Sequence, residues 1–241
     1  MLGNLFGGGD LMENLLGLLI RIIALLPALT FHEWAHGYMA YKLGDATAKA
    51  DGRLSLNPLD HLDPLGALMM LLVGFGWAKP VPVNTRHFKK PRRDFALVSL
   101  AGPMMNFIVA LVSAFLSVLA GYILRFVELP LMIETVILLI FTYSIMINLG
   151  LGLFNLIPLP PLDGSNIVIC TLPNNLAAKY SKLRFYSRYI FLGLILLQYV
   201  PILEIIPTIV FAPLGFLRNV LYSAFVGLAD LIINPIFANL L

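Results

Sequence analysis

Two long apolar stretches, residues 95–124 and 131–157, constrain what this chain can fold into. As helices they would extend for roughly 45 and 40 Å, whereas the hydrocarbon core of a bilayer is about 30 Å thick. Each stretch is therefore long enough to cross a membrane with tilt. The short connection between them contains Arg125, Glu128 and Pro130, so we expect two separate transmembrane helices.

The composition extends this prediction to the whole chain. Of the 241 residues, 59% are hydrophobic and 12% are charged, whereas charged residues make up about 25% of a soluble domain. The sequence therefore predicts an all-α polytopic membrane protein whose surroundings are the lipid bilayer. We expect a single membrane-embedded unit over residues 1–241, with a core at 11–170 and accessory helices at 186–233. About five transmembrane helices are predicted, at residues 11–43, 95–124, 131–157, 186–203 and 208–233.

Residues 45–94 connect the first two predicted helices and contain two distinct pieces. The apolar run 65–76 has 12 residues, too few to span, and fits a re-entrant or interfacial segment. The prolines of residues 77–84 exclude a helix, and their alternating pattern favours an extended edge strand or hairpin. His61 and His87 also lie in this connection. Each either contacts the active site or is a solvated loop residue, and His61 is the better candidate for the active site.

His32, Glu33 and His36 form an H-E-x-x-H sequence near the end of the first predicted helix. Four residues turn a helix by about 400°, so the two imidazoles project from one face and can bind the same metal ion. Glu33 borders this face, where it can act as general base toward a water on the open side of the metal. Ionisable groups at membrane depth are costly and indicate function by default. The alternative is that neighbouring helices merely satisfy these polar groups.

A third metal ligand is predicted where the helix at 131–157 ends. Pro158, Pro160 and Pro161 must break that helix. Backbone groups freed at membrane depth are tolerated only inside protein or beside a water-filled cavity. Asp163 follows the break and can supply an oxygen ligand, which leaves a fourth position for water. Alternatively, Asp163 only caps the next helix.

The predicted cofactor is zinc, with one Zn²⁺ per chain. The chain has a single cysteine, Cys170, which excludes a cysteine-based zinc knuckle. The metal must therefore be held by nitrogen and oxygen, and we expect the ligands to be His32, His36 and Asp163.

Asn106 brings an amide into the second predicted helix. It follows Ala101, Gly102 and Pro103, small and helix-kinking residues that permit the close approach of another helix. Asn106 either takes part in the chemistry or only makes a hydrogen bond between helices.

Positive charge orients the predicted helices. Of the 16 Lys and Arg, nine lie in residues 42–94 and four in residues 162–189. By the positive-inside rule, the side that holds these two connections is cytoplasmic. The His36 end of the first helix and the Asp163 end of the third lie toward the same side. We therefore expect the active site in the cytoplasmic half of the membrane.

The chain resembles the site-2 protease family of intramembrane zinc metalloproteases, in the compact bacterial type without PDZ or CBS domains. The resemblance covers approximately residues 25–169. Three motifs in order carry it: His32-Glu33-x-x-His36, Gly102-Pro103-x-x-Asn106, and Asn155 through Leu162-Asp163-Gly164. Residues 76–81 are also similar to a loop of that family.

This resemblance implies that the protein cleaves peptide bonds within or beside the transmembrane segments of single-pass proteins, in a bacterial cell membrane. It implies that Glu33 activates water and that Asn106 positions substrate or stabilises the transition state. It also implies that residues 77–84 pair with unwound substrate as an added strand. We expect no nucleic-acid partner, and the sequence leaves the oligomeric state open.

Two other functions compete with proteolysis. A catalytically silent scaffold could bind membrane segments with the same fold, but it would not need Glu33 together with a complete ligand set. A metal transporter would place polar groups along several helices, whereas the predicted spans carry almost none outside the motifs.

Overall fold

The structure is a computed structural model that describes residues 11–66, 69, 77–197 and 205–238. Apart from one isolated β-bridge between Leu62 and Ala78, the regular structure of these residues is helical, which confirms the all-α prediction. The elements in chain order are α2 (Leu11–Lys42), α3 (Thr47–Ala50), α4 (Pro58–His61), η1 (Thr85–His87), α6 (Pro91–Ile123), η2 (Leu124–Phe126), α7 (Leu131–Asn155), α8 (Asp163–Thr171), α9 (Asn174–Leu197) and α10 (Ile205–Phe237).

Four helices of the described residues are long and apolar enough to cross a membrane, namely α2, α6 with η2, α7 and α10. They correspond to four of the five predicted spans, and the protein is an integral membrane protein. The fifth prediction, residues 186–203, falls on the second half of α9 and on residues 198–203, which lie outside the described residues.

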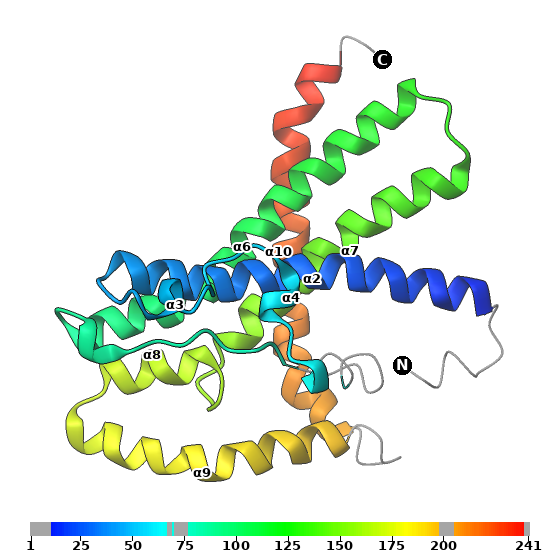
Figure 1. Ribbon diagram of the computed structural model, residues 1–241. Helices are drawn as coiled ribbons and strands as arrows, with labels where there is room; N and C mark the ends of the chain where they lie inside the picture. The colour runs from blue at the N-terminus through cyan, green and yellow to red at the C-terminus, as the bar shows by residue number, and fades with distance from the viewer. Residues whose placement is uncertain (1–10, 67–68, 70–76, 198–204, 239–241) are drawn as a thin grey trace.

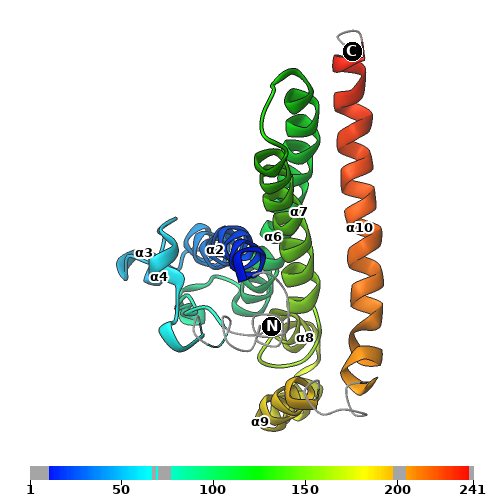
Figure 2. The same ribbon diagram turned by 90° about the vertical axis from the view of Figure 1, so that its right-hand side faces the viewer.

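The membrane helices form a crossed arrangement (Figure 1). Helices α6 and α7 lie side by side, and α10 packs against both. Figure 2 shows α10 as a column beside the α6–α7 pair, with its C-terminal end toward the connection between those two helices. Helix α2 crosses this group and packs against α6 and α7, while α8 packs against α6 at the opposite end from that connection. The helices that carry the three motifs are thus mutual neighbours.

Small side chains let the membrane helices approach closely. Ala110 and Ala114 of α6 pack with Ile145 and Leu149 of α7 and Ala229 of α10, and all five are fully buried. Close packing of small residues is the usual basis of helix association in a bilayer, where apolar surface alone gives no preference for protein over lipid.

The helix ends follow the local sequence. Helix α2 runs without a break through Pro27 and stops before Gly44, whose φ of 108° is readily adopted only by glycine. Pro91 is the first residue of α6, where its missing N–H costs nothing. Helix α7 ends at Asn155, ahead of the three prolines that were predicted to break it.

The connection between α2 and α6 contains an extended segment, residues 77–84, in which the structure has no helix. Lys79 N–H donates to the His61 carbonyl at 2.8 Å, and its carbonyl accepts from Arg53. Asn84 N–H donates to the fully buried Asp45 carboxylate at 2.7 Å. The segment is therefore held at both ends. The predicted re-entrant run, residues 65–76, lies almost entirely outside the described residues.

Candidate metal centre

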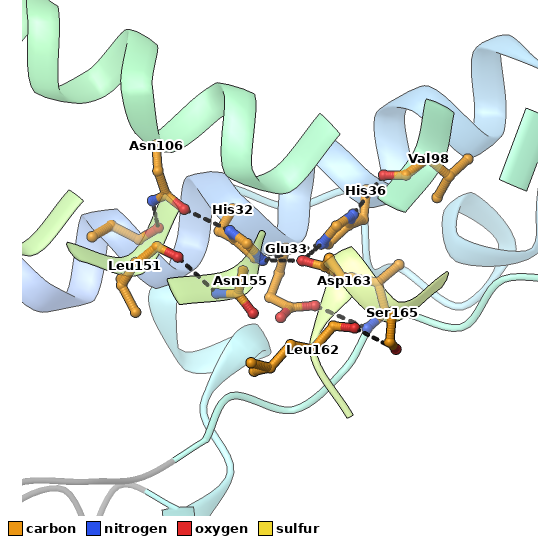
Figure 3. A network of polar contacts seen from close by, with 12 residues as sticks. His32, Glu33, His36, Val98, Asn106, Leu151, Asn155, Leu162, Asp163 and Ser165 are labelled. Atoms are coloured by element: carbon orange, nitrogen blue, oxygen red, sulfur yellow. Dashed lines mark hydrogen bonds and ion pairs between the residues drawn. The ribbon is translucent and has the colours of Figure 1, made fainter. Parts of the chain in front are cut away.

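Side chains from α2 and α8 converge on one point beside α6 (Figure 3). His32 Nε2 lies 3.2 Å from Asp163 Oδ2, His36 Nε2 lies 3.3 Å from the same oxygen, and the two Nε2 atoms are 3.1 Å apart. These three residues form the group of potential metal ligands that the described part of the chain contains. The structure thus brings together the three residues that the sequence singled out as ligands.

Local structure explains how each ligand reaches this point. His32 and His36 are four residues apart in α2 and so share a face. Asp163 is the first residue of α8, directly after the proline-rich break. This turn requires glycine at position 164, because the Cβ of any other residue would lie 2.3 Å from the Leu156 carbonyl oxygen and clash with it.

The outer nitrogens of both imidazoles face acceptors. His32 Nδ1 lies 2.6 Å from Asn106 Oδ1, and His36 Nδ1 lies 2.7 Å from the Val98 carbonyl oxygen. Both acceptors come from α6. Because each Nδ1 must therefore carry the proton, each neutral ring presents an unprotonated Nε2 to the centre. The short distance between the two Nε2 atoms is then not a hydrogen bond.

The arrangement fits a zinc ion. Asp163 brings a carboxylate oxygen to the two imidazole nitrogens, and nitrogen and oxygen ligands of this kind bind zinc. The Oδ2 atom of Asp163 is buried and accepts no hydrogen bond from any residue that the structure describes. Three lone pairs thus face one another, which is favourable only around a cation. Tetrahedral zinc ligands at 2.0–2.1 Å are about 3.3 Å apart, close to the three separations found here.

Gly102 of α6 forms the floor beneath the two imidazoles. A Cβ at this position would lie 2.4 Å from His36 Nε2 and 2.7 Å from His32 Cε1. The small residues around Gly102 were predicted to permit close approach of another helix, and the groups that approach are the histidine rings of α2. Only a residue without a side chain fits here.

Glu33 lies beside the cluster and faces the extended segment (Figure 3). Its Oε2 accepts a hydrogen bond of 3.1 Å from the backbone N–H of Val81. The side chain of Glu33 makes no other hydrogen bond among the described residues. One carboxylate oxygen is therefore anchored and the other is available for proton transfer.

Asn106 is fully buried, and both N–H groups of its amide donate within the protein. Besides His32, it contacts the Ala28 carbonyl at 3.1 Å and Asn148 Oδ1 at 2.9 Å through its Nδ2. The sequence left two roles open for Asn106, a part in the chemistry or a hydrogen bond between helices. The structure shows hydrogen bonds from Asn106 of α6 to α2 and α7. Asn148 was missed, although an amide within an apolar span is the signal that drew attention to Asn106.

Two further histidines do not join the cluster. His61 is buried, and its Nε2 lies 2.7 Å from the Ser55 carbonyl oxygen. His87 pairs with Asp45 at 2.9 Å and is half-exposed. Both histidines stabilise the connection between α2 and α6.

The chain is similar to known proteins over much of its length. Residues 130–198 match the family model described as Peptidase family M50. A Bacillus subtilis (strain 168) protein named "Putative zinc metalloprotease YwhC" is 47% identical over 173 residues, which are 72% of this chain and 78% of that protein. A Mycobacterium tuberculosis (strain H37Rv) protein named "Putative zinc metalloprotease Rip2" is 32% identical over 155 residues, 61% of this chain and 56% of that protein. No solved structure matches the chain.

The family model covers α7, the break after it and Asp163, and the similarity to the Bacillus subtilis protein extends over most of both chains. The membrane helices agree with the resemblance drawn from the three motifs. The chain therefore belongs to peptidase family M50, the site-2 protease family, and is an integral-membrane zinc metalloprotease.

Proposed function

We propose that this protein is an intramembrane endopeptidase that uses one zinc ion per chain to cleave transmembrane segments of single-pass proteins. The observation that carries the proposal is the position of His32, Glu33 and His36 inside α2, a helix long and apolar enough to span the membrane. A hydrolytic site built into such a helix has its substrates within the bilayer rather than in solution.

In the proposed reaction, three residues bind the metal and a fourth transfers the proton. His32, His36 and Asp163 would hold the zinc ion, which would supply Lewis-acid polarisation of the scissile carbonyl and lower the pKa of a water molecule to about 7. Glu33 takes the proton of the attacking water on Oε1, because Oε2 already accepts the hydrogen bond from Val81. Glu33 then returns the proton to the leaving amine. The contact of Asn106 with substrate stays a prediction.

The extended segment is the proposed substrate-binding element. Its Val81 N–H reaches Glu33, so a peptide lying along the segment would pass close to the general base. Pro80 and Pro82 have no N–H, so at these positions the segment offers only carbonyl acceptors to an added strand. A helical substrate must unwind before it can pair in this way, which favours substrates with helix-weakening residues.

Additional prolines in the extended segment test this role. Ala78→Pro and Val83→Pro should raise KM or abolish cleavage while zinc binding survives, because they disturb the backbone and not the ligands. Unchanged kinetics in both variants would contradict strand pairing.

We further propose that the site opens to the cytoplasmic leaflet of a bacterial cell membrane, because 13 of the 16 Lys and Arg lie in the two connections on that side. Exposed Pro91 and Glu128 lie at opposite ends of α6 and its continuation. In a Cys170→Ser background, single cysteines at these positions are labelled in intact cells with a membrane-impermeant maleimide. Labelling at 128 but not at 91 is expected, and the reverse would overturn the orientation.

The decisive experiment compares wild type with Glu33→Gln. Each is co-expressed with a panel of tagged single-pass membrane proteins, and fragments are identified by mass spectrometry. Glu33→Gln should keep stoichiometric zinc and lose cleavage by at least about 100-fold, because only proton transfer is removed. Glu128→Gln, a matched change at an exposed position, should cleave normally. Retained turnover in Glu33→Gln would refute the assignment, and zinc transport without any fragment would favour a transporter.

A further inference from the structure

Two buried amides connect α7 to the metal centre. Asn106 of α6 and Asn148 of α7 are both fully buried and are joined by a hydrogen bond of 2.9 Å from Asn106 Nδ2 to Asn148 Oδ1. Asn106 Oδ1 in turn lies 2.6 Å from His32 Nδ1. A continuous path of hydrogen bonds therefore runs from α7 through α6 to a predicted zinc ligand on α2.

Backbone carbonyls determine the orientation of both amides. The Ala28 carbonyl can only accept, so the amide group that faces it at 3.1 Å must be Asn106 Nδ2. The Ser144 carbonyl likewise requires Asn148 Nδ2 at 2.9 Å. Asn148 Oδ1 is then left to accept the second N–H of Asn106. Every polar hydrogen of the Asn106 amide is thus used, and its oxygen is directed to His32.

The consequence of losing Asn148 follows from this assignment. Without an acceptor at position 148, one N–H of Asn106 would be buried without a partner, which is unfavourable because the group loses its hydrogen bond and cannot reach water. Asn106 could reduce this cost only by moving its amide, and any such movement disturbs the hydrogen bond that keeps the proton on His32 Nδ1. A ring with its proton on Nε2 cannot bind metal through that atom.

We propose that Asn148 is a positioning residue for the metal centre, which acts through Asn106 to hold His32 in the tautomer and orientation that bind zinc. This inference rests on the proposed ligand set. Asn148 touches neither ligand nor substrate in this role. Its contribution is therefore to zinc affinity, and the effect depends on Asn106 being present.

Zinc affinity measured by competition with a chelator tests the inference on purified full-length protein. Asn148→Leu keeps a side chain of similar shape without the acceptor and should weaken zinc binding 10–100-fold, the usual effect of losing a residue that supports a ligand. Asn148→Ala gives the same comparison should the leucine variant not fold. Ser113→Ala is the matched control, because it removes another α6–α7 hydrogen bond, the one of 2.9 Å between the Ser113 and Ser144 hydroxyls. The Ser144 backbone carbonyl, which orients Asn148, is unchanged in this variant, so its zinc affinity should equal that of wild type.

A double-mutant cycle separates positioning from general stabilisation. Asn106→Ala combined with Asn148→Leu should bind zinc no more weakly than Asn106→Ala alone, because Asn148 acts only through Asn106. Wild-type zinc affinity in Asn148→Leu, or a double variant whose loss is the product of the two single losses, would overturn the inference. A separate measurement tests the proposed ligand set. If His32 is not a zinc ligand, His32→Ala should bind zinc as tightly as wild type, whatever the result for Asn148→Leu.

Discussion

Replacing Gly102 with alanine tests the metal centre through a single added methyl group. The new Cβ would lie 2.4 Å from His36 Nε2 and 2.7 Å from His32 Cε1, whereas unbonded heavy atoms at contact are about 3.5 Å apart. The rings would have to retreat by about 1 Å. Neither can tilt freely, because Asn106 and Val98 hold their outer nitrogens.

The size of the effect follows from this displacement. A bond of 2.0–2.1 Å between zinc and nitrogen cannot stretch by 1 Å, so Gly102→Ala should lose at least one imidazole as a ligand. A misplacement of about 1 Å near reacting groups costs about 100-fold in rate. We expect zinc affinity and cleavage rate each to fall by at least about 100-fold, although helix propensity alone favours alanine over glycine by roughly 1 kcal/mol.

The assay measures zinc by chelator competition and cleavage with a tagged membrane substrate. Gly121→Ala provides the matched control in the same helix, because a Cβ there meets no heavy atom within 4 Å. It should bind zinc and cleave as wild type does. If Gly102→Ala matched Gly121→Ala in both measurements, the imidazoles would not pack against Gly102 of α6.

Three other substitutions probe the remaining contacts. Val81→Pro removes the N–H that anchors Glu33 and should lower kcat at least 10-fold with zinc retained, whereas Val83→Pro should act on KM; equal kcat in the two variants would count against the anchoring role. Asp163→Ala should lose both zinc and activity in metal analysis, because two histidines leave the site under-coordinated, and full zinc occupancy would mean that another residue is a ligand. Gly164→Ala should destabilise the protein by about 2 kcal/mol or more, since its Cβ would lie 2.3 Å from a backbone oxygen, and an unchanged melting temperature would contradict this.

The sequence predicted the parts of the site that depend on local structure. The spacing of His32 and His36 places them on one face of any helix, and the prolines before Asp163 break any helix at that point. Four of the five predicted spans also match helices of the described residues, because length and hydropathy decide a membrane span almost alone.

What the sequence did not reveal depends on contacts between distant residues. The bond from Val81 to Glu33 joins residues 48 positions apart, and the bond between His36 and the Val98 carbonyl joins residues 62 apart. Backbone groups are present at every residue, so no pattern distinguishes Val81 or Val98 beforehand. Asn148 was visible as an amide in an apolar helix, but its partner depends on how α6 and α7 align.

The neighbouring residues His32 and Glu33 are held by different parts of the fold. His32 faces α6, where Asn106 binds its ring, while Glu33 points about 100° around α2 and meets the extended segment through Val81. Changes in α6 should therefore act first on zinc affinity, and changes in the extended segment should act first on proton transfer and substrate binding. Because the same segment both anchors Glu33 and is the proposed partner of the substrate strand, a substrate that binds there also contacts the element that positions the general base.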